Sequence, residues 1–129
     1  MSKIESYTDL IVWQKSIGMV TSVYSLVKEF PSDERFGLTS QIKRCSVSIP
    51  SNIAEGWGRS SSKSFAQFLR IAKGSLYELE TQIVIGKNLK YITDSKEIDD
   101  LIIEISKMLN SLIKKLEEKT NHSSLTASH

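Results

Sequence analysis

Apolar side chains recur along most of the chain at intervals of three and four residues, the spacing that places them on one face of an α-helix. Four segments show this pattern, and the connections between them are short, so neighbouring helices should run antiparallel. The pattern predicts an all-α fold, an up-down-up-down antiparallel four-helix bundle. The predicted bundle spans residues 1–119, with helices at about 9–29, 33–57, 62–89 and 94–118, and residues 120–129 form a disordered polar tail.

The first and third segments are apolar over more of their circumference than one bundle core requires. In the first segment, a stripe through Trp13, Ile17 and Val20 lies beside a second apolar stripe. A helix that packs in a single core needs an apolar face only somewhat wider than 100°. The surplus predicts a contact with a second copy of the chain. We expect this oligomer contact to involve Val12, Met19, Val23, Leu26, Phe30, Ile71 and Ile85.

The join between the second and third segments combines a proline, two glycines and a tryptophan. Pro50 lacks an amide hydrogen and its ring crowds the preceding turn, so it is expected to kink or divide the second helix. Gly56 and Gly58 flank Trp57 and should end that helix. The Trp57 ring is expected either to fill the corner between the helices or a seam between subunits, or to present an exposed face on which a base stacks.

Length and composition are typical of one soluble domain. The chain has 129 residues, one cysteine and two histidines. No stretch approaches the roughly 18 apolar residues that a bilayer-spanning helix needs, and the start of the chain lacks the apolar segment of a secretory signal. A single cysteine excludes an internal disulfide and fits a reducing compartment. We therefore expect a cytoplasmic protein.

The net charge of +2 conceals an uneven distribution, because residues 43–90 carry eight basic and three acidic side chains, a net charge of +5. Such an excess favours a polyanionic partner, although a run of charges can equally be an ordinary solvated helix face. We predict nucleic-acid phosphate contacts in this region, with two aromatic residues available for stacking or for an interface. The cations are Lys43, Arg44, Arg59, Lys63, Arg70 and Lys73, and the aromatic residues are Trp57 and Tyr77.

Catalytic residues are not evident. Both histidines, His122 and His129, fall in the predicted tail, so the folded body lacks a histidine base for its serines or for Cys45. Zinc-type spacing of Cys and His is absent. One acidic helical face could hold Mg²⁺, as in all-helical nucleotide pyrophosphatases, but a solvated acidic flank is the expected role. That face contains Glu97, Asp100 and Glu104. We predict no enzymatic activity, metal or cofactor.

Three sequence segments resemble a known family. They are GLTSQIKR, SVSIPSNIAEGWGRSSS and FLRIAKGSLYELETQ, and they are similar to the four-helix intervening-sequence proteins encoded within insertions in bacterial large-subunit ribosomal RNA genes, a ribosomal-protein-like family. The similarity covers roughly Tyr7 to Leu116, with Lys43 and Cys45 standing where relatives often have Arg and Ala. The architecture also resembles the accessory variability protein of diversity-generating retroelements, which binds nucleic acid and its reverse transcriptase. The resemblance implies a homopentamer around a central channel with a nucleic-acid role.

Taken together, the charge and the resemblance predict a non-enzymatic homo-oligomer that binds nucleic acid, RNA more than DNA, as an accessory or scaffold factor. The alternative is a protein-interaction scaffold without direct nucleic-acid binding. Its partner, for example a polymerase, would then present an acidic surface to the same cations.

Overall fold

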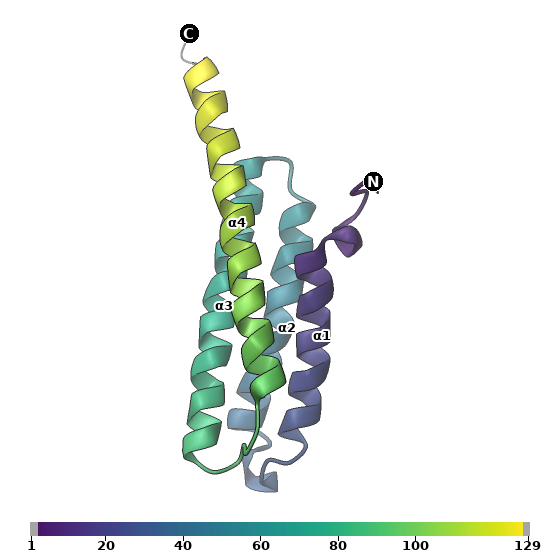
Figure 1. Ribbon diagram of the computed structural model, residues 1–129, viewed down its shortest axis with the longest axis vertical. Coiled ribbons are helices and arrows are strands. Elements are labelled where there is room, and N and C mark those ends of the chain that lie inside the picture. Colours follow the sequence, from purple (N-terminus) through teal and green to yellow (C-terminus); the bar gives the residue numbers. More distant parts are fainter. Residues whose placement is uncertain (1–2, 128–129) are drawn as a thin grey trace.

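Four α-helices lie side by side and are joined by short connections (Figure 1). The computed structural model describes the backbone of residues 3–127 and the side chains of residues 3–121, and this part of the chain contains no β-strand. The helices and two short 3-10 turns follow the order η1 (Tyr7–Asp9), α1 (Ile11–Val27), η2 (Ser32–Glu34), α2 (Leu38–Trp57), α3 (Ser62–Asn88) and α4 (Lys96–Ala127). The predicted all-α fold of four helices is confirmed.

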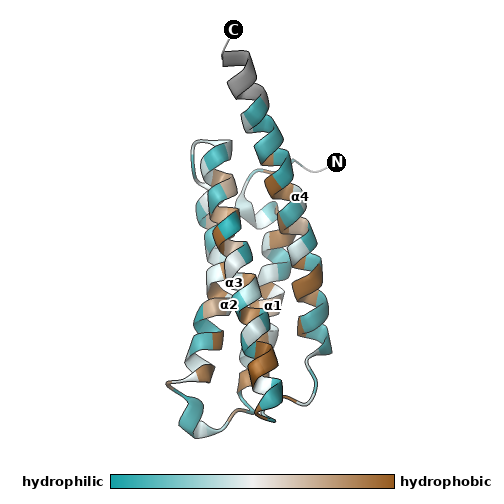
Figure 2. Cartoon of the chain, turned by 90° about the vertical axis from the view of Figure 1, so that its left-hand side faces the viewer, coloured by the Kyte–Doolittle hydropathy of each residue, from teal (hydrophilic) through white to brown (hydrophobic). Residues whose placement is uncertain are grey.

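Each helix packs against its two neighbours in chain order, and α4 returns to pack against α1. The helices α1 and α3 are therefore diagonal to each other. Apolar and hydrophilic positions alternate along each helix in Figure 2, as expected when one face is buried. The fully buried side chains of α2 and α3, including Ile49 and Leu76, form the centre of the core with Met19 of α1 and Ile105 of α4.

The core also contains most of the α1 residues that were expected to contact a second copy. Val12, Met19, Val23 and Phe30 are all buried in the single bundle, and Leu26 is half-buried beside them. The assignment of these four buried residues to an oligomer contact is therefore wrong. Of the two apolar stripes on α1, the bundle buries the one that contains Met19. The stripe through Trp13, Ile17 and Val20 stays partly exposed.

Pro50 does not divide α2, which is continuous from Leu38 to Trp57. The surrounding turns contain polar side chains that hydrogen-bond backbone carbonyl groups. Ser48 Oγ donates to the Cys45 carbonyl at 2.7 Å, and Asn52 Nδ2 donates to the Ser48 carbonyl at 2.7 Å. Such side-chain bonds tend to bend a helix slightly, and here they lie in the turns around the position where proline lacks a donor.

The helix α4 is longer than the sequence pattern indicates. It continues past Glu118, its predicted end, to Ala127, so residues 120–127 are helical rather than a disordered tail. Residues 128–129 lie outside the described part of the chain. Within this extension, the Thr120 side chain also bonds the preceding turn, since its Oγ1 donates to the Leu116 carbonyl at 2.9 Å. As a result, α4 extends beyond the ends of the other helices (Figure 1).

The two loops at the opposite end of the bundle are joined through Glu34. Its Oε2 accepts a hydrogen bond from the Tyr91 hydroxyl at 2.9 Å, and its Oε1 accepts one from the Leu38 amide at 3.3 Å. The bond with Glu34 raises the pKa of Tyr91 above its ordinary value. One carboxylate thus connects the loop after α1, the start of α2 and the loop after α3.

Candidate nucleic-acid interface

The six predicted cations do not form one patch. Lys43 lies on the α1 side of α2, where its Nζ is 5.0 Å from the centroid of the Tyr24 ring. Arg44 donates to Ser40 Oγ at 3.3 Å and lines the groove between α2 and α3 that also contains Glu78. Lys43 and Arg44 are neighbours in sequence, but successive helical residues point about 100° apart. The structure therefore separates them.

Arg59 and Trp57 belong to the corner between α2 and α3. The guanidinium carbon of Arg59 is 4.7 Å from the centroid of the Phe68 ring, and its Nη2 is 3.5 Å from Glu55 Oε1. Trp57 is half-buried and makes an edge-to-face contact with Phe65 at 6.0 Å between ring centroids. This position fits the role of a corner filler better than that of an exposed stacking platform.

Three cations and one aromatic residue do share a surface, here called the α3 basic flank, which consists of Lys63, Arg70, Lys73 and Tyr77. Lys63 and Arg70 line an open groove of about 450 Å³ whose other wall is the C-terminal half of α4, with Thr120 and Asn121. Tyr77 is 47% exposed, and Lys73 Nζ lies 5.8 Å from its ring centroid. The seven-residue spacing of Lys63, Arg70 and Tyr77 aligns them along one side of α3.

Arg70 is engaged by a carboxylate of α4. Its Nη2 forms an ion pair with Glu117 Oε1, and both side chains are close to half exposed. Exposed pairs of this kind contribute about 0–1 kcal/mol to stability. A phosphate group can therefore replace Glu117 at small cost, and Arg70 remains available for binding.

Four further cations were missed by the count of charges along the sequence. They lie on α4 beyond its acidic first turns, where all four side chains are exposed, and none forms an ion pair with a described residue. They are Lys107, Lys114, Lys115 and Lys119. Residues 91–129 have a net charge of −2, but their acids are concentrated at the start of α4. Counting charge separately for residues 96–104, which have one base and four acids, and residues 105–121, which have four bases and two acids, would have identified the basic part of the helix.

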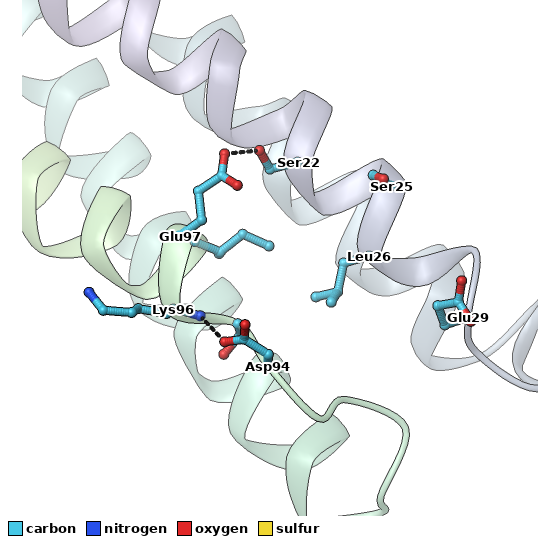
Figure 3. Close-up of a pocket in the computed structure, with 9 residues that line it drawn as sticks. Ser22, Ser25, Leu26, Glu29, Asp94, Lys96 and Glu97 are labelled. Atoms are coloured by element: carbon cyan, nitrogen blue, oxygen red, sulfur yellow. Dashed lines mark hydrogen bonds between the residues drawn. The ribbon is translucent and has the colours of Figure 1, made fainter.

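The acidic start of α4 faces the end of α1 across an open groove of about 390 Å³ (Figure 3). Glu97 Oε1 accepts a hydrogen bond from Ser22 Oγ at 2.9 Å, which directs this carboxylate toward α1. Asp100 pairs with Lys96 at 2.8 Å. Glu104 pairs with Lys15 of α1, also at 2.8 Å. The three carboxylates considered for Mg²⁺ thus point to three separate partners, and the described residues contain no group of three ligands that could hold a metal ion.

Cys45 is placed to pack rather than to react. Its side chain is buried, and its Sγ donates to the Ser75 carbonyl at 3.0 Å. Burial, reinforced by the nearby Glu78 carboxylate, raises the pKa of the Cys45 thiol to about 12. Because the thiolate is the reactive form, this cysteine is a weak nucleophile at neutral pH.

Exposed apolar side chains occur on several faces of the bundle, and two of these faces bear on the predicted oligomer contact. Ile71 and Ile85 of α3 are 46% and 42% exposed, so they remain available for the predicted oligomer contact. On the other face, Ile17 and Tyr24 of α1 and Val47 of α2 are also substantially exposed. The sequence pattern assigned the wrong α1 stripe to the surface. The bundle buries the stripe that contains Met19 and leaves Ile17 and Tyr24 exposed.

The fold and its surface define an all-α bundle protein that displays a basic flank. Residues 8–111 match the family model of the 23S rRNA-intervening sequence protein, so the chain belongs to that family. A similar solved structure is that of a protein of unknown function from the S23 ribosomal protein family of Bacteroides thetaiotaomicron. The two share 28% sequence identity and a TM-score of 0.72, over 81% of this chain and 99% of the other.

A search among curated proteins gave no match. Within the part of the chain that the structure describes, no helix is long and apolar enough to cross a membrane.

Proposed function

We propose that the chain is a non-enzymatic, homo-oligomeric helical-bundle protein that binds nucleic acid as an accessory or scaffold factor. The observation that supports this function best is the α3 basic flank, where Lys63 and Lys73 are without ion-pair partners among the described residues. The exposed Tyr77 ring lies within the same surface and offers a face on which a base can stack. The preference for RNA over DNA rests on the family, whose name refers to 23S rRNA.

An oligomer would strengthen this weak surface. A single flank offers few phosphate contacts, but each copy in an assembly adds the same contacts to one polyanionic ligand, which raises the overall affinity. A pentameric ring would display the flank five times around its axis. Since binding by cations releases condensed counterions, the affinity should fall steeply as salt increases.

The test compares two variants that each lose two cations. Lys63→Ala with Lys73→Ala removes part of the α3 basic flank, whereas Lys28→Ala with Arg35→Ala removes the same charge from the opposite end of the bundle. Binding of a labelled RNA hairpin is measured by fluorescence anisotropy between about 50 and 200 mM salt, with duplex DNA of equal length as the comparison. Light scattering reports the mass of each assembly.

We expect the flank variant to bind RNA at least about ten-fold more weakly at low salt, and the slope of log affinity against log salt to fall by about 1.4 or more, for two lost phosphate contacts. The control variant should change affinity less than about two-fold, because distant exposed charges are screened. Equal losses in both variants would contradict the assignment of the flank. An affinity that does not depend on salt would contradict phosphate binding altogether.

A further inference from the structure

An apolar groove lies between the start of α1 and the middle of α4, on a different face of the bundle from the α3 basic flank. Its volume is about 360 Å³, and apolar side chains form its floor and its α1 wall. Ile11, at the start of α1, is 52% exposed there. The groove is lined by Leu10, Ile11, Val12, Lys107, Met108, Ser111, Leu112 and Lys115.

The groove exists because α1 is too short to cover α4. The 17 residues of α1 and the 32 residues of α4 correspond to about 25 Å and 48 Å of helix. The pairs Lys15–Glu104 and Ser22–Glu97 set the two helices antiparallel, so α1 begins opposite the middle of α4. Figure 1 shows α4 continuing beyond this point.

The 3-10 turn η1, which precedes α1, does not fill the space. The turn η1 packs against α1 and α2 rather than α4, and its Tyr7 makes an edge-to-face contact with Trp13 at 5.4 Å between ring centroids. The place where a longer α1 would continue along α4 is therefore vacant among the described residues. Its α4 wall is a helix surface with an apolar stripe, which is the kind of surface against which an amphipathic helix packs.

The rim of the groove is positively charged. Lys107, Ser111 and Lys115 lie four residues apart, so they form one line of about 12 Å along α4. Both lysines are exposed, and neither pairs with a described carboxylate. The small Ser111 side chain leaves room between them. The Lys15–Glu104 pair, with 2.8 Å between Nζ and Oε1, joins α1 and α4 about one helical turn from Ile11 and Met108.

We propose that this groove is the docking site for an acidic amphipathic helix of a protein partner. The apolar face of that helix would cover Met108, Leu112 and Ile11, and its carboxylates would pair with Lys107 and Lys115. The charge on the rim selects an acidic helix, since a neutral or basic one leaves both lysines without a counter-charge. The site is separate from the α3 basic flank, so protein and nucleic acid can bind at the same time.

The test uses the full chain and a fluorescein-labelled peptide of about 14 residues, or four helical turns. Leucines occupy positions i, i+3, i+4 and i+7 of the peptide, and glutamates occupy the others. A second peptide carries lysine in place of every glutamate. In anisotropy titrations we expect the glutamate peptide to bind at least about ten-fold more tightly than the lysine peptide, because only the first complements the rim.

Two variants and one control locate the binding. Lys107→Glu with Lys115→Glu reverses the rim, and Ser111→Trp fills the groove without changing its charge. Each should weaken binding of the glutamate peptide at least about ten-fold. The control, Lys28→Glu with Arg35→Glu, makes the same charge change at the opposite end of the bundle and should alter binding less than about three-fold. Circular dichroism verifies that every variant keeps its helical content.

RNA binding separates this proposal from the proposed function. Ser111→Trp should lose the peptide and retain the RNA hairpin, whereas Lys63→Ala with Lys73→Ala should retain the peptide. Tight binding of the lysine peptide, or normal peptide binding by Ser111→Trp, would overturn the proposal. A lower assembly mass for Ser111→Trp in light scattering would also overturn it, since the groove would then hold a second copy of the chain.

Discussion

Replacing Gly56 with alanine should destabilise the bundle, although the same change normally strengthens a helix. A Cβ atom at Gly56 would lie 2.6 Å from Phe68 Cβ and 2.9 Å from Phe65 Cδ1. Phe68 Cβ is attached directly to the α3 backbone, so it cannot move aside without separating α2 from α3. Overpacking of this kind costs about 1–3 kcal/mol, against a gain of about 1 kcal/mol in helix propensity. We expect a net loss of up to about 2 kcal/mol.

Gly18 and Gly74 provide matched controls. Both lie inside helices, and a Cβ atom at either position would meet no atom within 4 Å. Alanine at Gly18 or Gly74 should therefore stabilise the protein by about 0.5–1 kcal/mol, through propensity and a less flexible unfolded chain. Because the changes in the free energy of unfolding have opposite signs, the comparison does not depend on the absolute stability of the protein.

Urea denaturation, at one fixed protein concentration because an oligomer links stability to concentration, gives the free energy of unfolding of each variant. A change of 1 kcal/mol should also shift the Tm by about 4 °C in a domain of this size. If Gly56→Ala stabilises the protein as much as Gly18→Ala does, then α2 and α3 do not approach each other closely at this corner. Close packing between these two helices would then not be what orients Trp57 and Arg59.

Three further predictions concern the surface and the buried thiol. Glu117→Gln removes the carboxylate that pairs with Arg70 and should tighten RNA binding by about two- to five-fold, measured by anisotropy, since one competing negative charge is lost; weaker binding would show that the pair positions Arg70 instead. Cys45 should react with iodoacetamide at pH 8 far more slowly in the native protein than in urea, because its pKa of about 12 keeps the thiol protonated; equal rates, followed by mass spectrometry, would contradict its burial. Glutamate at both Ile71 and Ile85 should reduce the assembly mass in light scattering, because two charges would have to be buried in the contact; an unchanged mass would exclude this face.

Periodicity identified the helices because it depends on local spacing, which four long amphipathic segments display clearly. It could not decide which of the two α1 stripes is buried. Both stripes are apolar and adjacent, and the choice depends on where α2 and α4 approach α1. The bundle buries Met19 and Val23 completely and leaves Ile17 and Tyr24 partly exposed. Only the positions of neighbouring helices, which are not a property of α1, carry that information.

The candidate site was predicted in part for a similar reason. Lys63, Arg70 and Tyr77 were correctly placed on one side of a helix, because they are separated by whole pairs of helical turns. Lys43 and Arg44 were grouped with them only by closeness in sequence. The structure puts Lys43 beside Tyr24 of α1 and puts Arg44 in the groove between α2 and α3. The lysines of α4 were missed because acids at the start of the same helix cancel them in a count of net charge.

The two exposed apolar faces also bear on the kind of assembly that the chain can form. A two-fold dimer needs one self-complementary surface, whereas a ring needs two different surfaces that meet head to tail. Ile71 and Ile85 lie on α3, which is diagonal to α1 in the bundle, while Ile17, Tyr24 and Val47 lie on α1 and α2. A two-fold dimer that used one of these faces would leave the second face exposed to solvent. Two faces on different sides of the bundle would allow head-to-tail contacts, in which every copy covers one face of its neighbour and which close into a ring only if the rotation between copies does.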